Sequence, residues 1–180
     1  MGLFDILRKY GQDQLWSGLV ADRWLGMRGH DLDDRETSCT FCGIIDGRIQ
    51  ASVVYDDSET VAFVDLRQPE WPRGGHLLVV PRTHVEFLFD LPAPLAGSLM
   101  QSVVRVADAL RRVTGPGGIS VWSSNGAAAG QEVPHVHLHV LARYDGDQLL
   151  SVYGQSPARP ARAGLDDLAA RVQRELRQGF

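Results

Sequence analysis

Three histidines alternate with apolar residues in the run Val133-Pro-His-Val-His-Leu-His-Val-Leu141, and this alternation strongly constrains the local fold. Successive side chains of a β-strand point to opposite faces. A strand here therefore places three imidazoles on one face, those of His135, His137 and His139, and the intervening apolar side chains in the core. An apolar or mixed surface would be the ordinary choice for such a strand, so the run indicates a functional site.

The flanking sequence has the patterns of further strands and one long helix. β-Branched and aromatic runs predict strands at residues 51–56, 60–65, 76–81 and 119–123. The first two are separated only by Asp57-Ser-Glu59, which favours a hairpin. Apolar residues recur at helical spacing from Pro94 to Val113, until Gly115-Pro-Gly117 ends the pattern. The predicted main helix is therefore followed by two strands.

The two ends of the chain differ from this central part. Apolar residues between Leu3 and Leu25 predict one or two amphipathic helices, and the acidic stretch Asp31–Glu36 predicts a solvated linker. A Pro-rich linker at 156–162 precedes a predicted amphipathic helix at 165–176. We predict three segments: an extension with its linker at 1–38, a catalytic domain at 39–148, and a linker with a terminal helix at 149–180.

Composition narrows the class of protein. The 180 residues, 44% hydrophobic and 22% charged, are sufficient for one core with extensions, and the net charge of -4 argues against a general nucleic-acid binder. The sequence has neither an apolar run of about 18 residues nor a secretory signal, which favours the cytoplasm. The segment Gly2–Lys9 resembles an interfacial helix, but it is short and contains Asp5, so packing on protein is favoured over membrane contact.

The only two cysteines, Cys39 and Cys42, have C-x-x-C spacing. In a reducing compartment such a pair is more often a metal or redox motif than a structural disulfide. Imidazoles can act as nucleophiles, as acids or bases, or as metal ligands. Spacing alone does not decide which of these the three histidines are.

The segment Asn125–Leu141 resembles the signature of the histidine triad (HIT) superfamily. The similarity continues upstream through Val61–Leu66 and Gly75–His84, and covers about 39–147. The resemblance implies an α+β HIT-like fold: an antiparallel sheet of about five strands with one main helix, here with extra helices at both ends. It also implies a homodimer, a nucleotide substrate and no organic cofactor.

The resemblance also assigns roles to individual residues. It implies that His137 attacks the α-phosphorus to give a nucleotidyl-imidazole intermediate, which water or another acceptor resolves. His139 and Gln131 would act near the phosphate, and Asp65 would accept hydrogen bonds from the ribose. The remaining expected pocket residues are Asn125, His76, Phe63 and Leu66. For Phe63 and Leu66, ordinary core packing is an equal alternative.

Zinc-containing members of the superfamily resemble this chain in a second respect. They have a Cys-x-x-Cys before the first strands, a histidine after a Pro-Arg-Thr turn, and the first histidine of the triad. The implied ligands are Cys39, Cys42, His84 and His135. A site filled by four protein ligands has no open position for a metal-bound water, so we expect structural rather than catalytic zinc. The alternative is two free thiols, a surface His84, and a His135 that only supports the active site.

The substrate is not specified by these motifs. Glu132 stands where some branches, especially the phosphoramidase-like ones, carry serine or threonine, and Ala142 replaces a common proline before Arg143. We expect hydrolysis of a purine nucleotide conjugate, such as a dinucleoside polyphosphate or a nucleoside phosphoramidate. A nucleotidylyltransferase or phosphorylase, and a non-catalytic nucleotide-binding adaptor, remain alternatives. A zinc module for nucleic acid is disfavoured by the acidic charge balance.

Overall fold

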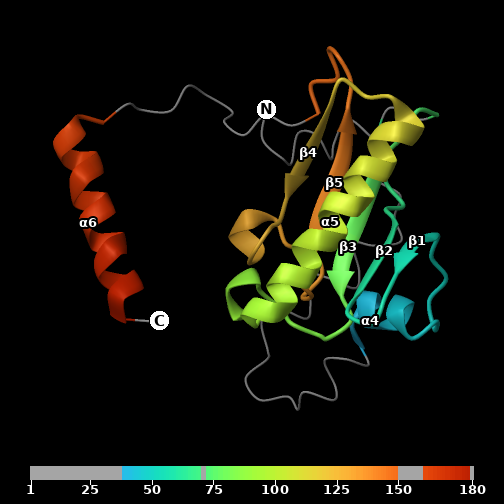
Figure 1. The fold of residues 1–180 in the computed structure, drawn as a ribbon, viewed down its shortest axis with the longest axis horizontal. Coiled ribbons are helices and arrows are strands. Elements are labelled where there is room, and N and C mark those ends of the chain that lie inside the picture. Colours follow the sequence, from blue (N-terminus) through green and yellow to red (C-terminus); the bar gives the residue numbers. More distant parts are fainter. Residues whose placement is uncertain (1–37, 70–71, 150–159, 179–180) are drawn as a thin grey trace. The chain divides into compact units, whose positions relative to one another are not determined.

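The structure, a computed structural model, describes residues 38–69, 72–149 and 160–178. The central elements in chain order are α4 (Thr40–Ile45), β1 (Val53–Asp56), β2 (Thr60–Val64), β3 (His76–Pro81), η1 (Leu88–Asp90), α5 (Ala93–Thr114), β4 (Gly118–Trp122), η2 (Ala127–Ala129) and β5 (Leu138–Arg143). The five strands form one antiparallel sheet in the order β1-β2-β3-β5-β4 (Figure 1). The predicted α+β class, with five strands and one main helix, is therefore confirmed.

Helix α5 covers one face of the sheet. Its buried side chains recur every three or four residues, which gives one apolar stripe along the helix. The stripe packs on inward-facing residues of β2, β3 and β5 and consists of Leu99, Val103, Val106 and Leu110. The helix ends at Gly115, whose φ of 56° is the left-handed conformation that glycine adopts without a Cβ penalty.

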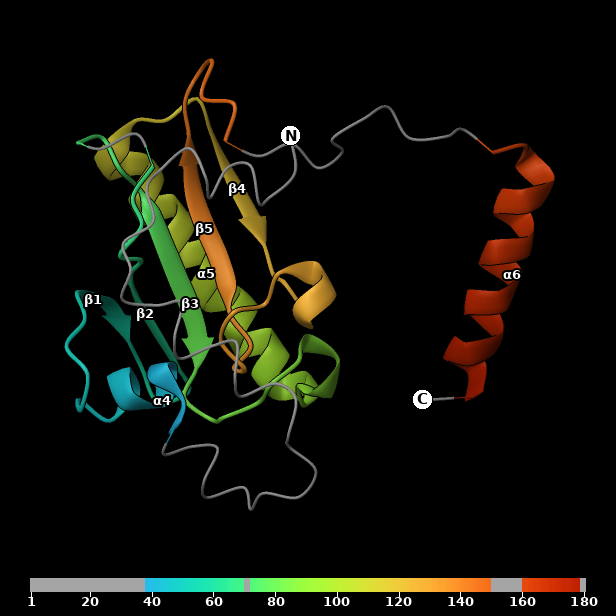
Figure 2. The same ribbon diagram turned by 180° about the vertical axis from the view of Figure 1, so that it is seen from behind.

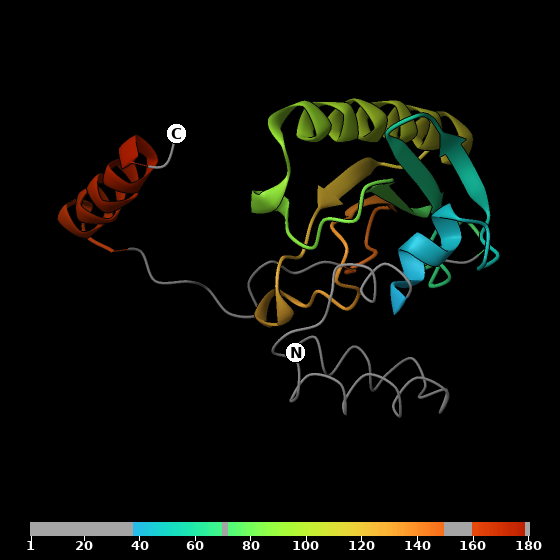
Figure 3. The same ribbon diagram turned by 90° about the horizontal axis from the view of Figure 1, so that it is seen from below.

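The opposite face carries a second apolar cluster around α4. Phe41 and the two cysteines pack there against side chains of β2 and β3, namely Val61, Phe63, Leu78 and Val80. Figure 2, the view opposite to that of Figure 1, shows this face with α5 behind the sheet. Figure 3 shows α5 and α4 on opposite sides of the sheet. Leu78 is paired in register with His139, so His139 projects from the α4 side. The layers therefore separate the histidines from α5.

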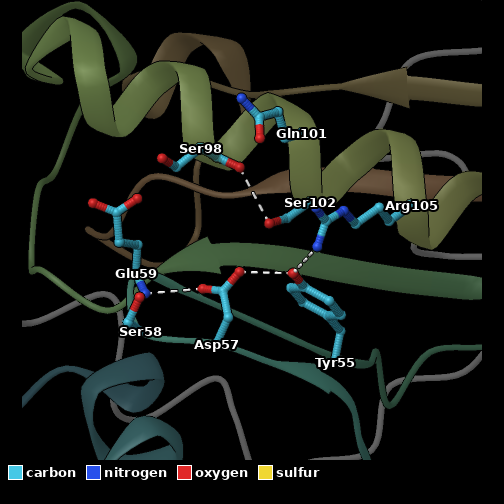
Figure 4. Close-up of a pocket in the computed structure, with 8 residues that line it drawn as sticks. All are labelled: Tyr55, Asp57, Ser58, Glu59, Ser98, Gln101, Ser102 and Arg105. Carbon is cyan, nitrogen blue, oxygen red and sulfur yellow. Dashed lines mark hydrogen bonds between the residues drawn. The ribbon is translucent and has the colours of Figure 1, made fainter.

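The predicted hairpin is also present, and a polar network ties it to α5. Asp57 accepts hydrogen bonds from the Tyr55 hydroxyl at 2.7 Å and from the backbone N–H groups of Glu59 and Thr60. These bonds, led by that of Tyr55, lower the pKa of Asp57 to about 2. Arg105 donates to the Tyr55 hydroxyl, and the network lines a pocket beside α5 (Figure 4). This pocket lies on the face of the sheet away from the histidines.

The histidine run differs from its predicted structure in one respect. Strand β5 begins only at Leu138, so His139 lies in the strand whereas His135 and His137 precede it. The ladder with β3 starts at the Val79–Leu138 pair, and β3 itself ends at Pro81. The ladder with β4 reaches no further than the Trp122–His139 pair, so residues before Leu138 pair with neither neighbouring strand, and a single strand through all three histidines was a wrong prediction.

Helix α6 (Arg162–Gln178) contains the terminal helix predicted at 165–176. Its apolar side chains are about half exposed and lie at helical spacing: Leu165, Leu168, Val172 and Leu176. None of the helices within the described residues is long and apolar enough to cross a membrane. The predictions for residues 3–25, the linker at 31–36 and most of the linker at 156–162 lie outside the described residues.

Candidate active site and metal centre

His137 is held in one tautomer by its own backbone. Its Nδ1 lies 2.7 Å from the carbonyl oxygen of His135, and because a carbonyl only accepts hydrogen bonds, Nδ1 carries the proton. Burial lowers the pKa of His137, opposed in part by that hydrogen bond and by the negative charges of Asp65 and Glu132. The ring is therefore neutral near pH 7, with the lone pair on Nε2. This is the form in which an imidazole attacks an electrophile.

His139 is oriented by two other side chains. His76 Nδ1 lies 3.2 Å from the carbonyl oxygen of Arg67, so it carries a proton, and neutral His76 offers Nε2 to His139 Nδ1 at 3.0 Å. The indole of Trp122 stacks on the His139 ring, with centroids 4.3 Å apart and planes at 7°. Neutral His139 thus has a lone pair at Nε2 and needs a second proton before it can donate to a phosphate from that atom.

Both imidazoles of this pair favour the neutral state. Burial, followed by repulsion from His137 and His76, lowers the pKa of His139 to about 3, and burial also lowers the pKa of His76. Asp65 brings a carboxylate within 4.8 Å of both rings. A metal ion bound there would have to displace the proton that lies between His76 Nε2 and His139 Nδ1, and would break the hydrogen bond between the two rings. We therefore assign this group to hydrogen bonding.

Three charged side chains flank the histidines. Asp65, at the end of β2, is 7% exposed and accepts a 2.6 Å hydrogen bond from the backbone N–H of Arg67. The Arg67 guanidinium then pairs with the Glu132 carboxylate through two hydrogen bonds of 3.2 and 3.0 Å. Segments 65 residues apart in sequence are thereby joined beside the histidines.

The amides expected in the phosphate loop bind protein groups. Gln131 is 8% exposed; its amide oxygen accepts from Gly126 N–H and its amide nitrogen donates to two backbone carbonyls. Asn125 accepts from the backbone N–H of Leu88 and donates to Ser123. Both amides shape the loop before the triad, and Gln131 is the closer in sequence to His135.

The two apolar candidates have different environments. Phe63 is 3% exposed and packs edge-on against Phe41 with centroids 5.4 Å apart, whereas Leu66 is 94% exposed beside Asp65. Phe63 thus lies in the core cluster of the α4 face, and Leu66 is free to contact a bound molecule. Arg143, at the end of β5, pairs with Asp147.

The four residues predicted as metal ligands meet in space. Potential ligand atoms of Cys39, Cys42, His84 and His135 all lie within 4.8 Å of one another. The Cys39 and Cys42 sulfurs are 3.5 and 3.6 Å from His135 Nδ1, and Cys42 Sγ is 3.3 Å from His84 Nδ1. Two thiolates and two imidazoles around a tetrahedral zinc ion have sulfur–nitrogen separations of about 3.6 Å. The residues therefore fit zinc.

The surroundings of His135 support the same fit. The side chain is fully buried, and its Nε2 donates to the carbonyl oxygen of Pro81 at 2.9 Å, which leaves the Nδ1 lone pair directed at the two sulfurs. A carbonyl partner on the second nitrogen is the usual arrangement for a metal-binding histidine. Burial also lowers the pKa of His135 to about 4, so the ring is neutral as a ligand must be.

Three residues of the site were not identified from the sequence. Trp122 ends β4 and stacks on His139, Phe41 packs edge-on against His137 with centroids 5.1 Å apart, and Arg67 pairs with Glu132. Phe41 lies between the two cysteines of the C-x-x-C motif, and this position is the one feature of the sequence that could have pointed to it. Trp122 and Arg67 have no local pattern, because their partners come from distant segments.

Comparisons with known proteins agree with the fold and the histidine motif. The family model for the HIT domain matches residues 46–146, more than half of the chain. An uncharacterised HIT-like protein from Methanocaldococcus jannaschii is 39% identical over 118 residues, covering 65% of this chain and 88% of that protein. The chain therefore belongs to the HIT family.

Two solved structures are similar over most of their length. A histidine triad nucleotide-binding protein from Candida albicans has a TM-score of 0.69 and 26% identity, covering 79% of this chain and 100% of that one. A Zn-bound histidine triad family protein from Mycobacterium smegmatis has a TM-score of 0.58 and 32% identity, covering 76% of this chain and 99% of that one. Both are at a level of identity that supports common fold and family.

Proposed function

We propose that this protein hydrolyses a purine nucleotide conjugate at its α-phosphate through a covalent intermediate on His137. The observation that carries the proposal is the neutral His137 ring, whose Nδ1 proton is engaged by the His135 carbonyl. The Nε2 lone pair would form a bond to phosphorus while the bond to the leaving group breaks, and the leaving group takes a proton from solvent or the site. Water then replaces the imidazole and releases the nucleotide.

Other residues supply the expected surroundings for this chemistry. Asp65 offers a buried carboxylate that can accept hydrogen bonds from ribose hydroxyls, and exposed Leu66 adjoins it. His139 lies 4.8 Å from His137 between ring centroids, close enough to act on the same phosphate once protonated. Gln131 holds the loop that carries the triad. The nucleotide-binding relative from Candida albicans supports a nucleotide as the substrate.

A trapping experiment tests the covalent step. The protein is mixed with a nucleotide conjugate labelled in the nucleotidyl part and quenched rapidly, and protein-bound label is measured. Label is expected in wild type and in His139→Ala, but not in His137→Ala. Tight nucleotide binding without any product that depends on His137 would instead indicate a nucleotide-binding adaptor. Products formed with added phosphate in place of water would indicate a phosphorylase.

We expect Trp122 to act as a positioning residue through His139. Trp122→Ala removes the stacked ring and leaves His139 with one fixed partner, so kcat is expected to fall about 10-fold with little change in KM. Trp122→Phe keeps a stacking surface and should stay within about threefold of wild type. Steady-state kinetics on all three proteins is the measurement, and an unchanged kcat in Trp122→Ala would remove this role.

We also propose that the cysteine and histidine cluster binds one structural zinc ion per chain through Cys39, Cys42, His84 and His135. The short sulfur–nitrogen distances and the carbonyl partner of His135 support this assignment. The zinc-bound relative from Mycobacterium smegmatis supports it as well. A bound zinc ion would supply a crosslink between α4, the turn after β3 and the segment before β5.

A homodimer is the proposed assembly. Strand β4 is an edge of the sheet within the described residues, and Met100 and Val104 on α5 are 50% and 62% exposed. Edge strands and exposed apolar side chains are typical sites of association. Light scattering coupled to gel filtration should give twice the chain mass of 19.8 kDa. A mass of one chain at micromolar concentration would contradict the dimer.

A further inference from the structure

Arg67 and Glu132 form a bidentate ion pair that contributes little to the stability of the fold. Both side chains are more than half exposed, at 65% and 61%, although the guanidinium makes two hydrogen bonds to the carboxylate. Exposed ion pairs contribute little to stability, because both charges are well solvated when apart. The pair can therefore exchange partners without disturbing the sheet.

Two segments of the chain connect the Arg67–Glu132 pair to the three histidines. On one side, the backbone of Arg67 donates to Asp65 and accepts from His76, which in turn contacts His139. On the other side, Glu132 follows the buried Gln131 in the loop that leads to His135. The pair thus joins the segment that holds Asp65 and His76 to the loop that leads to His135 and His137.

We propose that Arg67 and Glu132 form a charge selector for the leaving group of the nucleotide conjugate. This inference rests on the proposed function. A substrate phosphate presents oxygens that match the guanidinium as well as a carboxylate does, so it competes with Glu132 for Arg67. The displaced Glu132 carboxylate then repels additional anionic groups and attracts cationic ones. The preferred leaving group is an amine that carries a positive charge, rather than a polyphosphate.

The selector is tested with two substrates that share the same adenylyl group. One is a dinucleoside polyphosphate, and the other is an adenosine phosphoramidate of a diamine whose second amino group is charged. The measured quantity is the ratio of kcat/KM for the polyphosphate to that for the amine conjugate. Glu132→Gln keeps the shape of the side chain but removes its charge, so the ratio is expected to rise on the order of 3- to 10-fold.

Two further variants sharpen the test. Arg67→Gln leaves Glu132 unpaired and removes the cation, so kcat/KM is expected to fall for both substrates and the ratio to fall below that of wild type. Asp108→Asn removes the same formal charge from α5, where Asp108 pairs with Arg111 and Arg112, and should leave the ratio unchanged. High salt should reduce the effect of Glu132→Gln, because exposed charges are screened.

The outcomes separate this inference from the function on which it rests. If wild type turns over both substrates but the ratio of their kcat/KM values changes less than twofold in Glu132→Gln, the selector is overturned and the proposed hydrolase activity stands. A ratio that falls in Glu132→Gln also overturns it, since the carboxylate would then favour anionic leaving groups. Absence of both turnover and protein-bound label in wild type overturns the hydrolase and the selector together.

Discussion

Replacing His137 with alanine is expected to lower kcat for a nucleotide conjugate by at least about 10³-fold. The substitution removes the only group assigned to form the bond to phosphorus, and loss of a nucleophile is among the largest effects of single substitutions in enzymes. KM should change little, because Asp65 and the surrounding loop remain. Single-turnover kinetics with the purified variant is the measurement, alongside the trapping of labelled protein.

A second variant separates a nucleophile from a structural histidine. His137 is 5% exposed and packs against Phe41, so its removal also leaves a space. In His137→Gly that space can admit free imidazole, which can attack the same phosphorus and is then hydrolysed from the nucleotide in solution. Added imidazole should restore part of the turnover without protein-bound label. If His137→Ala kept activity within 10-fold of wild type and still carried protein-bound nucleotidyl label, His137 would not be the nucleophile.

Removal of zinc is expected to lower the melting temperature by at least about 10 °C. The proposed ligands join α4, the turn after β3 and the segment before β5, and binding of structural zinc stabilises the folded state strongly. Activity should fall in parallel, because the His135 ring would bind the metal while its carbonyl oxygen holds His137 Nδ1 at 2.7 Å. Metal analysis and thermal unfolding before and after a strong chelator measure both effects.

The control for the chelator is a protein that already lacks the site. Cys39→Ser combined with Cys42→Ser should contain no zinc, melt at a lower temperature, and show no further change when chelator is added. A chelator effect of equal size in this double variant would mean that the ion acts elsewhere. Protein purified with both thiols reduced but with far less than one zinc per chain would contradict the metal site directly.

Local patterns in the sequence predicted most of the fold. The hairpin across Asp57–Glu59, strand β3, helix α5 and its end at Gly115 were all predicted from alternation, helical periodicity and turn residues. These elements depend on neighbouring residues, which are visible in a short window of sequence. The start of β5 was not predicted correctly, because it depends on where pairing with β3 and β4 begins, and both partner strands come from other parts of the chain.

The candidate site was less accessible to this reasoning. Cys42 meets His84 and His135, which are 42 and 93 residues away, and only the family resemblance related them before the structure did. The stacking of Trp122 on His139 and the pairing of Arg67 with Glu132 had no signal at all. Such contacts arise where strands that are distant in sequence become neighbours, so no local pattern records them.

The sequence by itself determined that three histidines alternate with core residues and that the chain has the motif of its family. Only the tertiary structure decided how the three differ. His135 directs Nδ1 at the two cysteines, His137 donates to the carbonyl of His135, and His139 contacts His76 and Trp122. The physical reason is that alternation sets the side on which an imidazole lies, whereas its hydrogen-bond partners set its tautomer and hence its chemistry.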